Sequence, residues 1–168
     1  MSAIKPEDKN TLTVYIPDTR GVSLSRYGRG NLKIGPTVFT YSRLPGSPAR
    51  AALGSSYVDN FVAYLDGMRG TCPGSTPECE SICYAARPVG EHGPVSKMWQ
   101  DNRRDDVPPL PEEAKLLRLH VSGDFDTVTY INNWRAELTR RPDVTAWVYT
   151  RSWRVPSLMP ALELLRAL

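Results

Sequence analysis

The sequence lacks any segment that could anchor it in a membrane or direct it out of the cell. No stretch of the 168-residue chain approaches the roughly 18 consecutive apolar residues of a membrane-spanning helix. The N-terminal segment MSAIKPEDKN lacks the apolar core of a secretory signal peptide. We therefore expect a cytoplasmic protein that does not contact the membrane.

The chain also lacks a strong excess of charge of either sign. It has 21 Lys and Arg against 18 Asp and Glu, a formal net charge of +3, and the basic residues are scattered. Clustered Lys and Arg are typical of nucleic-acid-binding surfaces, so overall charge gives no indication of a nucleic-acid partner. No glycine-rich run carries the Lys-Ser/Thr of a P-loop or the spacing of a dinucleotide-binding fingerprint.

Cysteine is scarce and gathered in one place. The three cysteines, Cys72, Cys79 and Cys83, lie within twelve residues of one another. An odd number confined to one loop does not fit a disulfide framework, which usually spreads an even number along a short secreted chain. Thiolates bind zinc and the iron of iron-sulfur clusters. The sequence therefore predicts that the three cysteines bind one metal centre.

Three cysteines leave one position of a four-ligand site open. If no protein group fills it, one iron of a 4Fe-4S cluster is accessible to a small molecule, the arrangement used in radical chemistry with S-adenosylmethionine. If His92 or His120 fills it, the site is a Cys3His zinc site that stabilises the loop. A third interpretation is three packed thiols without metal. We expect the iron-sulfur cluster and keep zinc as the alternative cofactor.

Strand-like and helix-like patterns alternate in the second half of the chain. Residues 116–121 form a mostly apolar run, and apolar residues then recur at helical spacing from Val128 to Leu138, behind Asp126 as a helix cap. Residues 144–150 are β-rich, and a leucine-rich helical stretch follows from about Ser157. This order predicts an α/β fold, either a partial β/α barrel or a parallel sheet joined by helical crossovers.

The first half is less regular. Residues 1–54 combine many Gly, Pro and Ser with short strand-like alternations at 12–16 and 37–41, which predicts an irregular, β-rich N-terminal segment. Residues 55–168 begin with apolar residues at helical spacing from Val58 to Met68, a predicted helix that leads into the cysteine loop. A chain of this length supports one domain over residues 1–168. Because two βα units do not close a barrel, we expect this domain to be truncated at its C-terminus.

Two polar turns follow the two predicted parallel strands. Ser122-Gly123-Asp124 follows the first strand, and Thr150-Arg151-Ser152 follows the second. Ligands of parallel α/β folds bind at the carboxyl ends of the strands. We therefore expect Ser122, Gly123, Asp124, Thr150, Arg151 and Ser152 to lie at one edge of the sheet and to contact a cofactor.

Three motifs carry a resemblance to a known family. The loop TCPGSTPECESICYAAR, the strand and turn LRLHVSGDF, and the later VTAWVYTRSWRVP follow NLKIGPTVFTYS in the chain. These motifs resemble, in the same order, those of the phage gene product 88 family, a group of uncharacterised proteins of phages and prophages. The resemblance covers residues 31–168 in pattern and implies a phage protein, but it implies no settled activity.

A more distant likeness is to radical S-adenosylmethionine enzymes. In those enzymes three cysteines hold a 4Fe-4S cluster, and a Gly-Gly-Glu type turn after the next strand contacts the methionyl amino group. The likeness implies that role for Ser122-Gly123-Asp124, and Tyr84 is similar to the aromatic residue often found beside the last cysteine. The spacing C-x6-C-x3-C departs from the common C-x3-C-x2-C.

The expected function is that of a phage-type protein whose three-cysteine site holds an iron-sulfur cluster. The distant likeness implies radical chemistry on an unknown small-molecule or macromolecular substrate. The alternative is a noncatalytic phage protein in which a zinc-stabilised loop supports a surface that binds a host partner.

Overall fold

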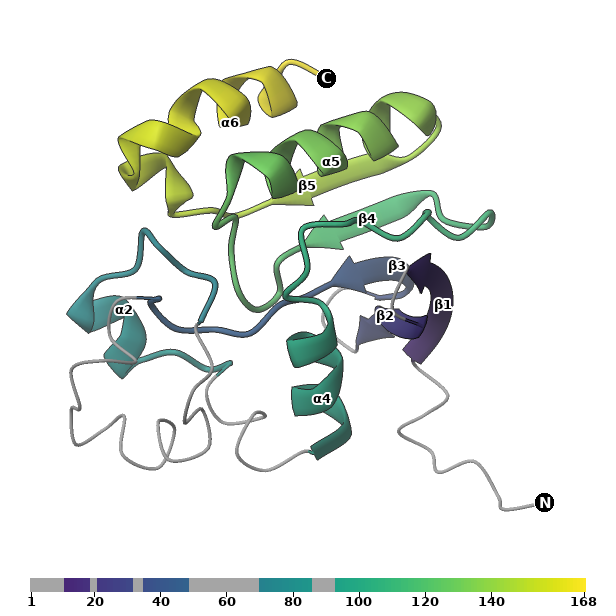
Figure 1. Ribbon diagram of the computed structural model, residues 1–168, viewed down its shortest axis with the longest axis horizontal. Helices are drawn as coiled ribbons and strands as arrows, with labels where there is room; N and C mark the ends of the chain where they lie inside the picture. Colours follow the sequence, from purple (N-terminus) through teal and green to yellow (C-terminus); the bar gives the residue numbers. More distant parts are fainter. Residues whose placement is uncertain (1–10, 19–20, 32–34, 49–69, 86–92) are drawn as a thin grey trace.

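The computed structural model describes residues 11–18, 21–31, 35–48, 70–85 and 93–168 (Figure 1). The helix predicted from Val58 to Met68 and the alternative zinc ligand His92 lie outside these ranges. Among the described helices, none is long and apolar enough to cross a bilayer.

The described strands form one mixed sheet. Its strands, in spatial order, are β1 (Thr11–Asp18), β2 (Gly21–Asn31), β3 (Gly35–Tyr41), β4 (Leu116–Leu119) and β5 (Thr145–Val148). The pairs β1–β2 and β2–β3 are antiparallel, whereas β3–β4 and β4–β5 are parallel. The predicted α/β class and the parallel pairing of the two later strands are confirmed. The described strands form an open sheet rather than a barrel. The described part of residues 1–54 contains β1, β2 and β3, which is the predicted β-rich character, and the pairing of β2 with β3 has a register shift between Arg29 and Asn31.

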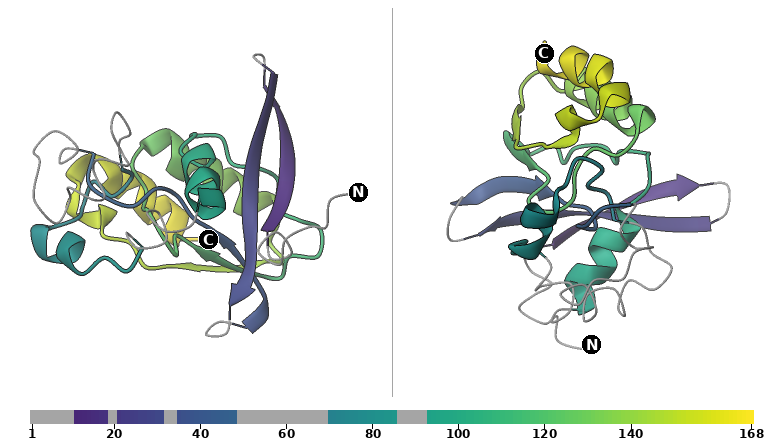
Figure 2. Two further views of the ribbon diagram at one scale, coloured as in Figure 1. Left: turned by 90° about the horizontal axis from the view of Figure 1, so that it is seen from below. Right: turned by 90° about the vertical axis from the view of Figure 1, so that its left-hand side faces the viewer.

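Helices lie on both sides of this sheet. The helices of the described chain are α2 (Pro77–Ser81), α4 (Gly93–Asp101), α5 (Val128–Arg140) and α6 (Met159–Arg166), and two 3-10 turns, η3 (Ser152–Arg154) and η4 (Pro156–Leu158), precede α6. Figure 2 shows α5 and α6 together on one side and α4 on the other. The crossover from β4 to β5 is α5, so the predicted βα order is confirmed.

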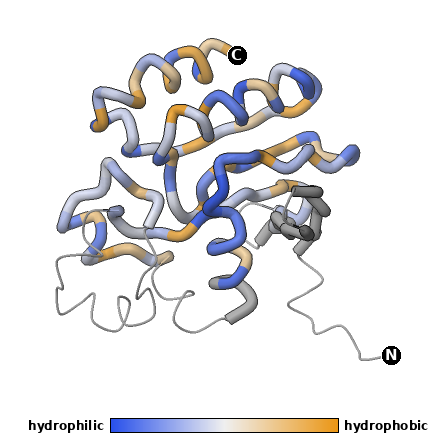
Figure 3. Tube along the Cα trace, in the orientation of Figure 1, coloured by the Kyte–Doolittle hydropathy of each residue, from blue (hydrophilic) through white to orange (hydrophobic). Residues whose placement is uncertain are grey.

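The main core lies between α5 and the sheet. Tyr130, Ile131 and Trp134 of α5 are fully buried, and they belong to one apolar cluster with Leu117 and Leu119 of β4. Figure 3 shows the alternation of apolar and polar residues along α5 and α6 that places one face of each helix inside. Each large apolar side chain buried in this way stabilises the fold by about 1.5–3 kcal/mol.

The start of α5 differs from the prediction. Thr127, not Asp126, is the N-cap, and its hydroxyl accepts a hydrogen bond from the Tyr130 backbone N–H at 3.0 Å. The Asp126 carboxylate instead forms an ion pair with Arg43, which lies two residues after the end of β3. The Asp126 side chain, which the local pattern assigned to the helix cap, therefore takes part in a long-range ion pair instead.

Candidate functional site

Two hydrogen bonds join the segments that follow β3 and β4 at the carboxyl edge of the sheet. The Arg43 backbone N–H donates to the Ser122 carbonyl at 2.9 Å, and the Ser122 hydroxyl donates to the Arg43 carbonyl at 2.9 Å. Gly123 has a φ of 76°, and a Cβ atom there would lie 2.8 Å from the Arg43 carbonyl carbon. Glycine is required at this turn because both the backbone conformation and the close approach exclude a side chain.

Asp124 joins the two turns that the sequence predicted to be neighbours. Its Oδ1 accepts hydrogen bonds from the Thr150 hydroxyl at 2.5 Å and from the Phe125 backbone N–H at 2.8 Å. Its Oδ2 accepts from the Arg151 backbone N–H at 2.8 Å. The residue is 5% exposed, and burial raises the pKa of its carboxyl while the hydrogen bonds oppose that rise. The structure brings the two turns together, and the Asp124 carboxylate connects them.

Asp124→Asn is expected to lower the free energy of unfolding by about 2 kcal/mol, because an amide NH2 replaces one accepting oxygen and leaves a donor of the network without its acceptor. Urea denaturation followed by circular dichroism measures this change. Glu163→Gln removes the same charge from an exposed position of α6 and serves as the control. An unchanged midpoint for Asp124→Asn would show that its hydrogen bonds do not stabilise the edge.

The start of the cysteine loop is fixed to the same edge. The Thr71 backbone N–H and hydroxyl both donate to the Leu44 carbonyl, at 3.0 and 2.8 Å, and the Thr71 hydroxyl accepts from the Asp124 backbone N–H at 3.3 Å. The Cys72 backbone N–H donates to the Gly46 carbonyl at 2.9 Å. Thr71 therefore connects the segments after β3 and β4 to the first cysteine.

Gly74 brings the loop against the turn that follows β5. A Cβ atom at this position would lie 2.0 Å from the Arg151 carbonyl oxygen, a distance that no substitution could tolerate without moving one of the two backbones. The sequence Cys72-Pro73-Gly74 can therefore pack on the β5 turn only because it carries no side chain at its third position.

The second and third cysteines are positioned by a single helical turn. Thr76 is the N-cap of α2 and accepts from the Cys79 backbone N–H at 3.2 Å, and Pro77 occupies the first turn. Cys83 follows two residues after this helix, and all three cysteines are partly exposed. Next to Cys83, the Tyr84 ring is exposed and its hydroxyl donates to the Val121 carbonyl.

The three thiols are neighbours without being arranged as ligands. Burial raises the pKa of Cys72 well above its ordinary value, and the charges of Asp124, Cys83 and Cys79 raise it further, so these groups lie within electrostatic range of one another. Within the described ranges, however, no three His, Cys, Asp or Glu side chains lie close enough to hold a metal ion. The donor set suits iron or zinc by its chemistry, although the described conformation does not bring it together as a metal site.

His120 lies in the core below the loop. Its backbone has a φ of 56°, its Nε2 is 3.0 Å from the Tyr130 hydroxyl, and its Nδ1 is 3.9 Å from Asp124 Oδ1. Its Nδ1 has no hydrogen-bond partner in the described part of the chain. Burial lowers the pKa of the imidazole well below its usual value, so this side chain is neutral at neutral pH. The structure does not bring His120 and the three thiols together as a Cys3His site.

Sequence reasoning missed Arg43, whose side chain connects the segment after β3 to the backbone of residues 102–103 and to Asp126. Its side chain is fully buried, with Nε donating to the Asn102 carbonyl at 2.8 Å and an Nη donating to the Arg103 carbonyl at 2.5 Å. It also pairs with Asp126 and lies over the Tyr130 ring, 3.9 Å from the centroid. The available signal was a charged residue directly after the strand-like run TVFTYS, at the same edge as the other turns.

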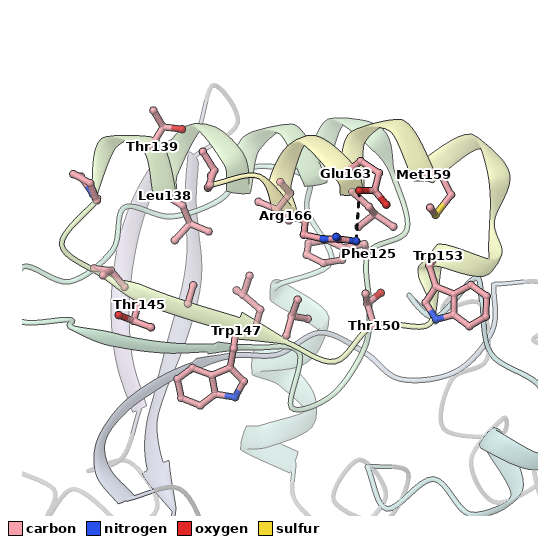
Figure 4. A pocket seen from close by; sticks show the side chains of 18 residues that line it. Phe125, Leu138, Thr139, Thr145, Trp147, Thr150, Trp153, Met159, Glu163 and Arg166 are labelled. Atoms are coloured by element: carbon pink, nitrogen blue, oxygen red, sulfur yellow. Dashed lines mark ion pairs between the residues drawn. The ribbon is translucent and has the colours of Figure 1, made fainter.

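A separate pocket lies between β5 and the two later helices (Figure 4). Most of its lining is apolar, and Glu163 and Arg166 of α6 pair at 3.7 Å beside it. No residue of the cysteine loop lines it. The pocket meets the candidate site at Thr150, whose hydroxyl donates to Asp124.

Comparisons with known proteins identify the family. The family model described as Gene product 88 matches residues 46–163. A Gene 88 protein of Mycobacterium phage L5 is 30% identical over 115 residues, covering 56% of this chain and 48% of that protein, and one of Mycobacterium phage D29 is 29% identical with the same coverage. The match thus spans about half the length of these relatives, and no solved structure matches the chain significantly. Since the family model covers most of its length, the chain belongs to the Gene product 88 family of phage proteins.

Proposed function

We propose that this protein binds one iron-sulfur cluster through Cys72, Cys79 and Cys83 and holds it at the carboxyl edge of the parallel strands. The observation that carries the proposal is the position of the loop. Thr71 fixes its start to the turn after β4, and Gly74 packs on the turn after β5. Carboxyl ends of parallel strands are where α/β folds bind their ligands.

The cysteine segment can adapt to a cluster at small cost to the fold. The helix α2 has one turn and contributes no buried residue, so moving Cys79 and Cys83 toward Cys72 disturbs little packing. Cys72 is the anchored member, because its backbone N–H is bonded to the segment after β3. Binding of a metal centre commonly supplies the free energy that orders such a loop.

Three protein ligands leave one iron of a 4Fe-4S cluster free for a small molecule, and we propose that this molecule is S-adenosylmethionine, used on a substrate within the host cell. The proposed contacts are the turns Ser122-Gly123-Asp124 and Thr150-Arg151-Ser152. Because both Asp124 oxygens already accept hydrogen bonds within the fold, the exposed Arg151 guanidinium is the group of these turns suited to a ligand carboxylate.

Metal and colour analysis tests the proposal. After purification without oxygen, the protein should be brown and should contain about four iron and four sulfide ions per chain, the content of a 4Fe-4S cluster. Calorimetric titration of this preparation should then detect S-adenosylmethionine binding. A colourless protein with stoichiometric zinc would instead support the zinc-stabilised loop of a noncatalytic protein, and a metal-free protein after reconstitution would contradict both forms of metal site.

A further inference from the structure

The two strands at the edge of the sheet, β4 and β5, present one face to α5 and the other face to the opposite side. Leu117 and Leu119 of β4 pack with α5, so Leu116 and Arg118 point to the opposite side. Arg118 pairs in register with Trp147 of β5. Trp147 is one of the residues that line the pocket, and Figure 4 shows its ring pointing away from α6. Arg118 and Trp147 therefore lie next to each other on the face of β4 and β5 opposite α5.

Two exposed tyrosines extend this surface toward the cysteines. Tyr149 follows Trp147 by two residues and is 78% exposed, and the Arg118 guanidinium lies 6.0 Å from the centroid of its ring. Tyr84, beside Cys83, is 65% exposed and is fixed by its hydrogen bond to the Val121 carbonyl, just beyond β4. Arg118 is near enough to act on the Tyr84 hydroxyl electrostatically. We call Tyr84, Arg118, Trp147 and Tyr149 the aromatic face.

Two arginines near the aromatic face have no carboxylate partner within the described part of the chain. Neither Arg118 nor the nearby Arg151 forms an ion pair with a carboxylate of the described residues. Asp124, at the same edge, is buried, and both of its carboxylate oxygens already accept hydrogen bonds from the turn after β5. At the amino ends of the strands, in contrast, Lys115 and Arg141 both pair with Asp143. The carboxyl end of the aromatic face thus offers cationic groups to an anionic partner.

We propose that the aromatic face binds single-stranded nucleic acid. Exposed aromatic rings stack on unpaired bases of any sequence, and guanidinium groups bind the phosphates between them. Arg118 over Tyr149 combines both elements at one place. Trp147 lies in register with Arg118, and Tyr84 lies within electrostatic range of it, so both supply further rings nearby. The bases of a duplex are already stacked on one another, so the aromatic rings cannot stack on them. Only the guanidinium groups would then bind a duplex, and they would bind it more weakly. The proposal does not depend on a bound cluster, because no cysteine belongs to the face.

Fluorescence anisotropy of a labelled, mixed-sequence single strand of about 12 nucleotides tests this inference on the protein before and after removal of metal. Wild type should bind in both states. Tyr149→Ala should weaken binding about tenfold, whereas Tyr149→Phe, which keeps the ring, should bind as wild type does. Arg118→Gln should weaken binding and reduce the slope of log K against log salt by about 0.7, the contribution of one phosphate contact to a single strand.

Two matched controls separate the face from the rest of the surface. Trp153→Ala removes an exposed aromatic ring on the pocket side of β5 (Figure 4), and Arg140→Gln removes an exposed charge from α5; both should bind as wild type does. Circular dichroism establishes that each variant is folded. The inference is overturned if wild type does not bind the single strand at low salt, if a duplex of the same length binds as tightly, or if folded Tyr149→Ala and Arg118→Gln bind unchanged. Failure of the cluster proposal alone would leave these results intact.

Discussion

Replacing Arg43 with Met is expected to lower the free energy of unfolding by about 3–5 kcal/mol, the usual cost of breaking a buried ion pair by removing one partner. The Arg43 side chain is fully buried and donates to the carbonyls of Asn102 and Arg103 as well as to Asp126. Methionine fills much of the same volume but donates no hydrogen bond. The substitution therefore leaves a partly buried carboxylate and two carbonyls without their donor.

Urea denaturation measured by circular dichroism gives the expected loss directly. Arg166→Met is the matched control, because Arg166 and its partner Glu163 on α6 are both exposed to solvent, so its removal should change stability little. Adding Asp126→Leu to Arg43→Met should recover part of the loss by removing the unpaired carboxylate. If Arg43→Met unfolded at the same urea concentration as the wild-type protein, the ion pair and its hydrogen bonds would make no net contribution to the free energy of unfolding.

The importance of Arg43 also shows where prediction from sequence reaches its limit. Apolar periodicity located β4, α5, β5 and α6, because each buries one face and repeats its pattern within a few residues. Those patterns contain no information about which distant carbonyls and carboxylate a single arginine will meet. Arg43 reaches residues about 60 and 83 positions further along the chain, and such contacts exist only after the strands have assembled.

For the candidate site, the sequence predicted that the two polar turns lie close together but not which hydrogen bonds join them. Parallel strands bring their carboxyl ends to one edge, so the proximity of Ser122-Gly123-Asp124 to Thr150-Arg151-Ser152 follows from the order of elements alone. The use of both Asp124 oxygens inside the fold does not follow from that order, because it depends on where the Thr150 hydroxyl and the Arg151 backbone N–H point. The contribution of Thr71 was hidden for the same reason, since its contacts to Leu44 and Asp124 are long-range.

The cysteines should behave as a unit, so Cys79→Ala is expected to abolish metal binding rather than to weaken it slightly. A 4Fe-4S cluster held by three thiolates already lacks a fourth protein ligand, and with two remaining thiolates it has too few bonds to the protein to persist. Iron and sulfide content after anaerobic reconstitution, together with visible absorption, measures the loss. Wild-type content in Cys79→Ala would exclude Cys79 as a ligand.

The structure allows this loss to be separated from unfolding. Cys79 lies in α2, which buries no residue, so truncating its side chain should leave the circular dichroism spectrum of the metal-free protein unchanged. Ser81→Ala is the control within the same turn, because the Ser81 hydroxyl is bonded only locally, to the Glu78 carbonyl at 2.9 Å, and serine is not the thiolate ligand that a cluster requires. Full iron content in Ser81→Ala and none in Cys79→Ala would assign the effect to the thiol. Equal loss in both variants would instead assign it to the conformation of α2, and the three-thiolate site would lose its main support.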